Sequence, residues 1–220
     1  MYQPSRRKLF SLAAVAPFAG GLLAAESARG ETAPQPAREK IRQRYFPNVV
    51  LRTQDDRQVR FYDDLVKDKV VTINMFYAKC EEICPLVIAN LARVQRLLGD
   101  KVGRDVFMLS ISLKPETDTP AALKSYAEMH GARPGWTFLT GAPADVEQLR
   151  RRLGFTNPDS LVDKDINQHI GNVRYGNEPL MLWGACPGQA SPEWIVESIS
   201  WMIRPETKSA VSAAAAAVKG

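Results

Sequence analysis

Outside residues 1–30, the sequence lacks a dense basic stripe with aromatic residues between the charges, and this absence limits its partners. Its formal net charge is +5 at pH 7, but residues 1–30 carry four basic residues against one acidic residue and so contribute +3 of it. The rest of the chain therefore has a net charge of only +2. Nucleic-acid binding relies on a basic stripe, often with aromatic side chains between the charges. We therefore expect no nucleic-acid partner.

The sequence also lacks a long, uninterrupted apolar run suited to a permanent membrane span. Residues 1–30 instead have the pattern of a targeting segment, with a twin-arginine-like start at Ser5–Phe10 and an apolar stretch from Leu12 to Ala25 that one proline and two glycines interrupt. We expect export to the periplasm or the outer face of the inner membrane, where disulfides are permitted. A polar, proline-containing linker follows at residues 31–45. If the segment stays uncleaved, it anchors the protein, so membrane association through the N-terminus remains open.

Residues 46–204 have the pattern of one α/β domain, and the alanine-rich residues 205–220 that of a low-complexity tail. Val70–Tyr77 and Val106–Leu113 are apolar, β-rich runs that predict strands buried on both faces. Between them, Pro85 suits the start of a helix, and apolar residues follow it at helical spacing. Further expected strands are Val49–Thr53, Gln58–Tyr62, Trp136–Thr140, Asn172–Tyr175 and Leu180–Trp183, and further expected helices are Pro120–Met129, Ala144–Leu153 and Pro192–Ile203. This order predicts a mixed central sheet flanked by helices on both faces, with the two long runs as neighbouring central strands.

Two cysteines stand where the first long strand ends: Cys80 and Cys84 lie four residues apart, directly before Pro85. Such a pair can close a disulfide, hold a soft metal ion, or do both in turn, and reduced copper prefers soft ligands. The partial positive charge of a helix N-terminus stabilises a thiolate and thereby lowers its thiol pKa. The residues alone leave copper binding and thiol redox chemistry open.

The chain has only two histidines, so the choice of a nitrogen ligand is narrow. His130 closes a predicted helix, where a histidine commonly interacts with the last carbonyl groups. His169 lies in a loop before the predicted hairpin. A loop histidine is most often a solvated surface group, but the cysteine pair elsewhere in the chain favours His169 as a ligand, because imidazole commonly completes a thiolate copper site.

These residues carry a resemblance to a known family. The segment Phe76–Pro85 with its C-x-x-x-C-P motif, and one histidine some eighty-five residues later, resembles the Sco/SenC family of copper-binding proteins over about Tyr45 to Ile203. The resemblance implies a thioredoxin-like fold and one copper ion held by Cys80, Cys84 and His169. It also implies one of two roles. The first is delivery of copper to a client protein, such as a cytochrome oxidase subunit whose copper centre the family helps to assemble. The second is extracytoplasmic thiol redox chemistry.

The chain departs from the family pattern at the site itself. Gln168 stands where an aspartate usually precedes the histidine, and Glu81-Glu82-Ile83 replaces the usual spacer between the cysteines. We interpret this as a divergent branch of the family, in which the ligand set is retained and the client protein differs.

Other functions remain open at this point. A thiol–disulfide oxidoreductase of the thioredoxin superfamily would use Cys80 and Cys84 as its redox pair, although such enzymes usually have a two-residue spacer. A thiol peroxidase usually needs a threonine close before its cysteine, and Ala78-Lys79 supplies none. A purely structural disulfide would close too short a loop to stabilise the chain much. The third cysteine, Cys186, is expected to be a small buried residue, with a resolving thiol or further ligand as the alternatives.

Overall fold

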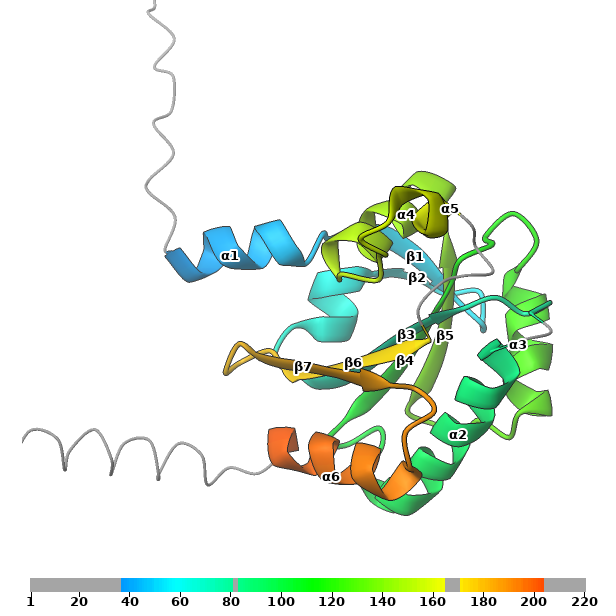
Figure 1. Ribbon diagram of the computed structural model, residues 1–220, viewed down its shortest axis with the longest axis vertical. Coiled ribbons are helices and arrows are strands. Elements are labelled where there is room, and N and C mark those ends of the chain that lie inside the picture. Colours follow the sequence, from blue (N-terminus) through cyan, green and yellow to red (C-terminus); the bar gives the residue numbers. More distant parts are fainter. Residues whose placement is uncertain (1–36, 81–82, 165–170, 204–220) are drawn as a thin grey trace, which may run out of the picture. The chain divides into compact units, whose positions relative to one another are not determined.

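The computed structural model describes residues 37–80, 83–164 and 171–203 (Figure 1). All of them belong to one compact unit that begins at Pro36. The helices are α1 Ala37–Tyr45, α2 Ile83–Leu98, α3 Pro120–Met129, α4 Pro143–Arg152, α5 Ser160–Lys164 and α6 Pro192–Ile203, with a π-helical turn η1 Phe61–Val66 and a 3-10 turn η2 Gly99–Lys101. The strands are β1 Val50–Thr53, β2 Gln58–Arg60, β3 Val70–Phe76, β4 Phe107–Ser112, β5 Trp136–Gly141, β6 Asn172–Asn177 and β7 Leu182–Pro187.

The strands form one mixed sheet in the order β2-β1-β5-β4-β3-β6-β7. The central strands β3, β4 and β5 run parallel, and the strands outside them pair antiparallel. The predicted neighbouring pair is confirmed, since β3 and β4 pair from Val71 opposite Phe107 to Phe76 opposite Ser112. Six of the seven residues of β3 are buried, as a strand covered on both faces requires.

Helices cover both faces of this sheet (Figure 1), which confirms the predicted thioredoxin-like α/β class. On one face, α2, α3 and α6 pack over alternate residues of the central strands, including Phe76, Met108 and Phe138. On the other face, η1 and α4 pack over Ile73 and Leu109. The period of two along each strand sends successive side chains into these two clusters. Within the three described ranges, no helix has both the length and the apolar character needed to cross a bilayer.

Besides the short helix α5, which was not expected, the local structure differs from prediction in four main places. Ala37–Tyr45, inside the expected linker, forms a helix, which an ion pair between Glu39 and Arg42 supports. The strand expected to reach Tyr62 ends at Arg60, because the π-helical turn η1 buries the next two aromatic side chains. Helix α2 already includes Ile83, so Pro85 lies within its first turn, where it removes no helical hydrogen bond. Cys186, expected in a loop, lies in β7 because the hairpin strands are longer than predicted.

Candidate metal centre

The two motif cysteines meet at the turn between β3 and α2. The amide of Cys80 donates a hydrogen bond to the carbonyl oxygen of Tyr77, with an N–O distance of 3.2 Å, and so turns the chain just after the strand. Cys84 lies in the first turn of α2, and its amide donates to the sulfur of Cys80 at an N–S distance of 3.4 Å. The predicted juxtaposition is therefore confirmed for this pair. Two soft donors on one turn fit a soft metal ion such as reduced copper.

Burial controls the protonation of Cys84, and the structure shows both cysteines of the pair in the reduced thiol form. Only 7% of Cys80 and 2% of Cys84 is exposed. Burial, with a smaller contribution from a hydrogen bond with Cys80, raises the pKa of the Cys84 thiol to about 12, and a backbone hydrogen bond with Tyr77 acts in the opposite direction. The expected lowering by the helix N-terminus is thus outweighed by desolvation. Cys84 is protonated at neutral pH and must release its proton to bind a metal ion.

Asp118 holds the chain just before Cys80 in place. Its carboxylate is 2% exposed and accepts hydrogen bonds from the amide of Ala78 at 3.0 Å and from the hydroxyl of Ser112 at 2.6 Å. It therefore ties the loop that carries the cysteines to the end of β4. Asp118 was not predicted as a site residue, because the sequence around it signals only the helix start at Thr119-Pro120.

His169 lies outside the described residues, so its position stays a prediction. The chain is described again from Gly171, whose carbonyl oxygen accepts a hydrogen bond from the amide of Gly188 at 2.7 Å. A Cβ atom on Gly171 would lie 2.7 Å from Cδ1 of Ile83. The chain two residues after His169 therefore packs against the first turn of α2, which carries Cys84.

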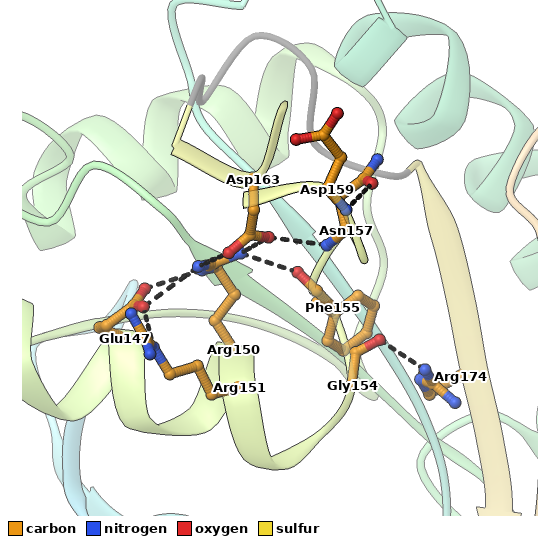
Figure 2. A network of polar contacts seen from close by, with 9 residues as sticks. All are labelled: Glu147, Arg150, Arg151, Gly154, Phe155, Asn157, Asp159, Asp163 and Arg174. Carbon is orange, nitrogen blue, oxygen red and sulfur yellow. Dashed lines mark hydrogen bonds and ion pairs between the residues drawn. The ribbon is translucent and has the colours of Figure 1, made fainter. Parts of the chain in front are cut away.

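A polar network holds the described chain on the other side of this segment (Figure 2). The guanidinium group of Arg150 binds both carboxylate oxygens of Asp163, at 2.7 and 2.8 Å, and also the carboxylate of Glu147. Asp163 accepts a further hydrogen bond from the amide of Asn157 at 2.7 Å. The Arg150 guanidinium and the Asn157 amide together hold the pKa of Asp163 well below its ordinary value of 3.8. The network fixes helix α5, which leads toward residue 165.

The remaining candidate residues have the structural roles that were expected. His130 ends α3, with its ring centroid 4.4 Å from that of Tyr126, and burial lowers its pKa. Cys186 is 2% exposed and pairs with Val173 across the β6–β7 hairpin, and burial raises its pKa to about 11. Among the residues that the structure describes, no three histidine, cysteine or acidic side chains are grouped so as to hold a metal ion.

Comparison with known proteins agrees with this geometry. The SCO1/SenC family model matches residues 44–204, which include β3, the cysteine turn and the terminal hairpin. The chain belongs to the SCO1/SenC family. The match covers most of the chain and confirms the resemblance drawn from the cysteine motif.

Individual SCO1/SenC relatives are distant in sequence. The chain is 26% identical over 134 residues to a Stutzerimonas stutzeri protein whose name describes copper binding, and 31% identical over 98 residues to the SCO1 protein homolog of Bacillus subtilis. These alignments cover 60% and 44% of this chain, but only 64% and 49% of the two relatives. The structure of Bradyrhizobium japonicum ScoI with copper bound is similar in fold, with a TM-score of 0.56, 23% identity, and coverage of 70% of this chain and 96% of that one.

Proposed function

We propose that this protein is an extracytoplasmic copper chaperone that carries one copper ion on Cys80, Cys84 and His169. The observation that carries the proposal is the pair of buried, reduced thiols on one turn, in a chain of the SCO1/SenC family. Thiolates are the preferred ligands of reduced copper, and an imidazole nitrogen commonly completes such a site. The packing of Gly171 against Ile83 supports His169 as the third ligand, because the chain returns beside Cys84 within two residues of it.

The copper ion is cargo in this proposal, and the residues of the chain determine how it is taken up and released. Cys84 releases its proton to solvent as its sulfur binds the metal, since burial keeps the thiol protonated beforehand. Asp118 keeps the cysteine turn in place during this exchange through its hydrogen bond from Ala78. The client is a copper protein of respiratory copper-site assembly, with a cytochrome oxidase subunit as the first candidate, because SCO1/SenC proteins take part in cytochrome c oxidase assembly.

The N-terminal residues support the extracytoplasmic location in this proposal. A twin-arginine-like segment begins the sequence. Cell fractionation of the full-length protein is expected to place it in the periplasm or on the outer face of the inner membrane. Replacing Arg6 and Arg7 by lysine should retain it in the cytoplasm if the twin-arginine route is used.

A thiol–disulfide oxidoreductase is the second candidate, since its redox pair would also lie at a strand end beside a helix N-terminus. The raised pKa of Cys84 makes its sulfur a poor attacking group, because only the thiolate attacks a disulfide, so Cys80 would be the attacking thiol of such an enzyme and Cys84 the resolving one. One preparation of the protein tests both functions. Anaerobic Cu(I) titration, followed by transfer to an apo copper domain, tests the copper chaperone. Reduction of insulin disulfides tests the oxidoreductase. We expect one copper ion per reduced chain, and none once the pair is oxidised. Equal copper binding by a Cys80→Ser, Cys84→Ser double variant would contradict the proposal.

A further inference from the structure

A cavity of about 370 Å³ lies on the face of the sheet opposite to the cysteine pair. Its lining is mostly apolar and includes Ile73 of β3 and Phe46, both buried, between the end of α4 and the β6–β7 hairpin. Ile41 and Tyr45 of α1 also line it and are 47% and 49% exposed, so the cavity opens to solvent beside this helix. Its volume lies in the range of small-molecule sites, about 300–1,000 Å³.

Two residues of this lining carry buried N–H groups that have no acceptor. Nε of Arg174 and Nε1 of Trp183 make no hydrogen bond to any residue that the structure describes. Arg174 lies opposite Ala185 in the β6–β7 register and Trp183 lies opposite Gly176, so the two side chains are diagonal neighbours on one face of the hairpin. Buried donors are nearly always paired in native proteins. Two unpaired donors side by side therefore point to a ligand with acceptor atoms.

Close contacts place these two side chains at the cavity. Nη2 of Arg174 donates a hydrogen bond to the carbonyl oxygen of Gly154, just after α4 (Figure 2), which leaves Nε as the unpaired part of the guanidinium group. The indole of Trp183 lies across Gly176, where a Cβ atom would come within 2.3 Å of the ring. Its other neighbour is Phe46, with ring centroids 4.8 Å apart. Gly176 therefore makes the room that lets the indole form part of the cavity wall.

The charge of the cavity favours an anion. Arg152 and Arg174 line it, and no acidic residue does. Neither arginine forms an ion pair with a residue in the described ranges, whereas Arg150 and Arg151 both pair with Glu147. A carboxylate has two acceptor oxygens and no donor, and it forms charge-assisted hydrogen bonds with such groups.

We propose that this cavity binds an alkyl carboxylate, a single apolar chain with one carboxylate head. The chain packs on Ile73 and Phe46, and a small rotation of Arg174 and Trp183 lets Nε and Nε1 donate to the two carboxylate oxygens. An alkyl chain suits these walls better than a peptide segment, because it brings no further polar groups that need partners. The inference goes beyond the proposed copper function and does not depend on it, since the two sites lie on opposite faces of the sheet.

The test titrates the full-length, copper-free protein with octanoate, decanoate and dodecanoate below their micelle concentrations. The chain has four tryptophans, and the indole N–H signal of Trp183 is assigned in a proton–nitrogen correlation spectrum by its loss in Trp183→Phe. We expect decanoate to move this signal downfield, as a new hydrogen bond requires. Affinity measured by calorimetry should rise about fourfold for each added CH₂ group. Decanol, which has the chain but no charge, should bind at least tenfold more weakly.

Two variants remove the donors one at a time. Trp183→Phe and Arg174→Gln should each weaken decanoate binding about tenfold. The controls are Trp194→Phe and Arg57→Gln, which change exposed residues outside the cavity and should leave the affinity unchanged. The Cys80→Ser, Cys84→Ser double variant should also bind decanoate as the wild type does.

Three results would overturn the inference: no decanoate binding, equal binding of decanol, or unchanged affinity in both Trp183→Phe and Arg174→Gln. If Arg174→Gln does not fold, unchanged affinity in Trp183→Phe alone would overturn it. A wild-type protein that binds decanoate but no copper would overturn the proposed function and leave this inference intact.

Discussion

The amide of Cys84 donates a hydrogen bond to the sulfur of Cys80 across the first turn of α2, with an N–S distance of 3.4 Å. This bond provides a partial positive charge to a sulfur that is otherwise buried beside apolar side chains. Desolvation keeps Cys84 protonated, so metal uptake at this sulfur must release a proton.

Copper binding should depend on pH. Because burial raises the pKa of Cys84 to about 12, each copper ion bound at neutral pH must displace at least one proton. Apparent Cu(I) affinity should therefore rise about tenfold per pH unit for each proton displaced. Calorimetry in two buffers of different ionisation enthalpy counts those protons, and Cys84→Ser should release one fewer than the wild type. Affinity that does not change between pH 6 and 8 would mean that the thiolate is already present in the metal-free protein.

Asp118→Asn should weaken both the fold and the copper site. Both hydrogen bonds from Ala78 and Ser112 end on the same oxygen of Asp118, and an amide oxygen accepts them without the assistance of a negative charge, while the new buried NH2 group needs an acceptor of its own. We expect the free energy of unfolding to fall by about 1–3 kcal/mol, measured by urea denaturation. Copper affinity should also fall, because the chain before Cys80 is no longer held. The exposed neighbour Glu116 supplies the control, and Glu116→Gln should change neither quantity.

Asp163→Asn should reduce stability at neutral pH and flatten its loss in acid. The pKa of Asp163 is held below 3.8 in the folded state by Arg150, so the unfolded chain takes up this proton first. The ionised Asp163 carboxylate therefore adds to the free energy of unfolding above about pH 4, and this addition is lost as the pH falls below that value. Urea midpoints between pH 7 and pH 2 should converge for wild type and variant at the acid end. Curves that stay parallel over this range would contradict the prediction, because they would show that ionisation of this carboxylate does not contribute to stability.

Cys186→Ala tests whether the third cysteine belongs to the site. Its side chain is buried in the hairpin opposite Val173, so the substitution should lower the free energy of unfolding by about 1 kcal/mol. Copper stoichiometry, copper affinity and insulin reduction should be unchanged. If copper affinity drops while the fold remains intact, Cys186 is a ligand or a resolving thiol, and the assignment of Cys80 and Cys84 as the only cysteines of the site is wrong.

Much of this fold was predictable because its signals are local. Helix α3 begins and ends as predicted: the Thr119 hydroxyl accepts from the Ala122 amide at 3.3 Å, Pro120 opens the first turn, and Gly131 follows the end with a φ of +67°. The buried strands β3 and β4 were likewise evident from their apolar runs. Such features depend on residues within one or two turns of each other.

The features that were not predicted depend on distant contacts. Asp118 acts on Ala78, forty residues earlier, and the sequence around it signals only a helix start. Helix α1 has a polar sequence typical of a linker. The chain directly after it is held by a distant contact, because the ring centroid of Phe46 lies 4.8 Å from that of Trp183. Burial of Cys84 likewise depends on the packing of elements far apart in sequence, which is why its pKa shifts against the direction expected from the helix N-terminus.

The most direct test of the central claim is anaerobic Cu(I) competition titration of the reduced protein, comparing wild type with His169→Ala, alongside insulin reduction. An imidazole ligand contributes to copper binding but has no necessary part in attack on a disulfide. We predict that copper affinity falls by about a hundredfold, the upper end of the losses seen for residues that support metal ligands. Insulin reduction should be nearly unchanged, and His130→Ala should alter neither. Full copper affinity in His169→Ala together with a collapse of thiol turnover would contradict the account.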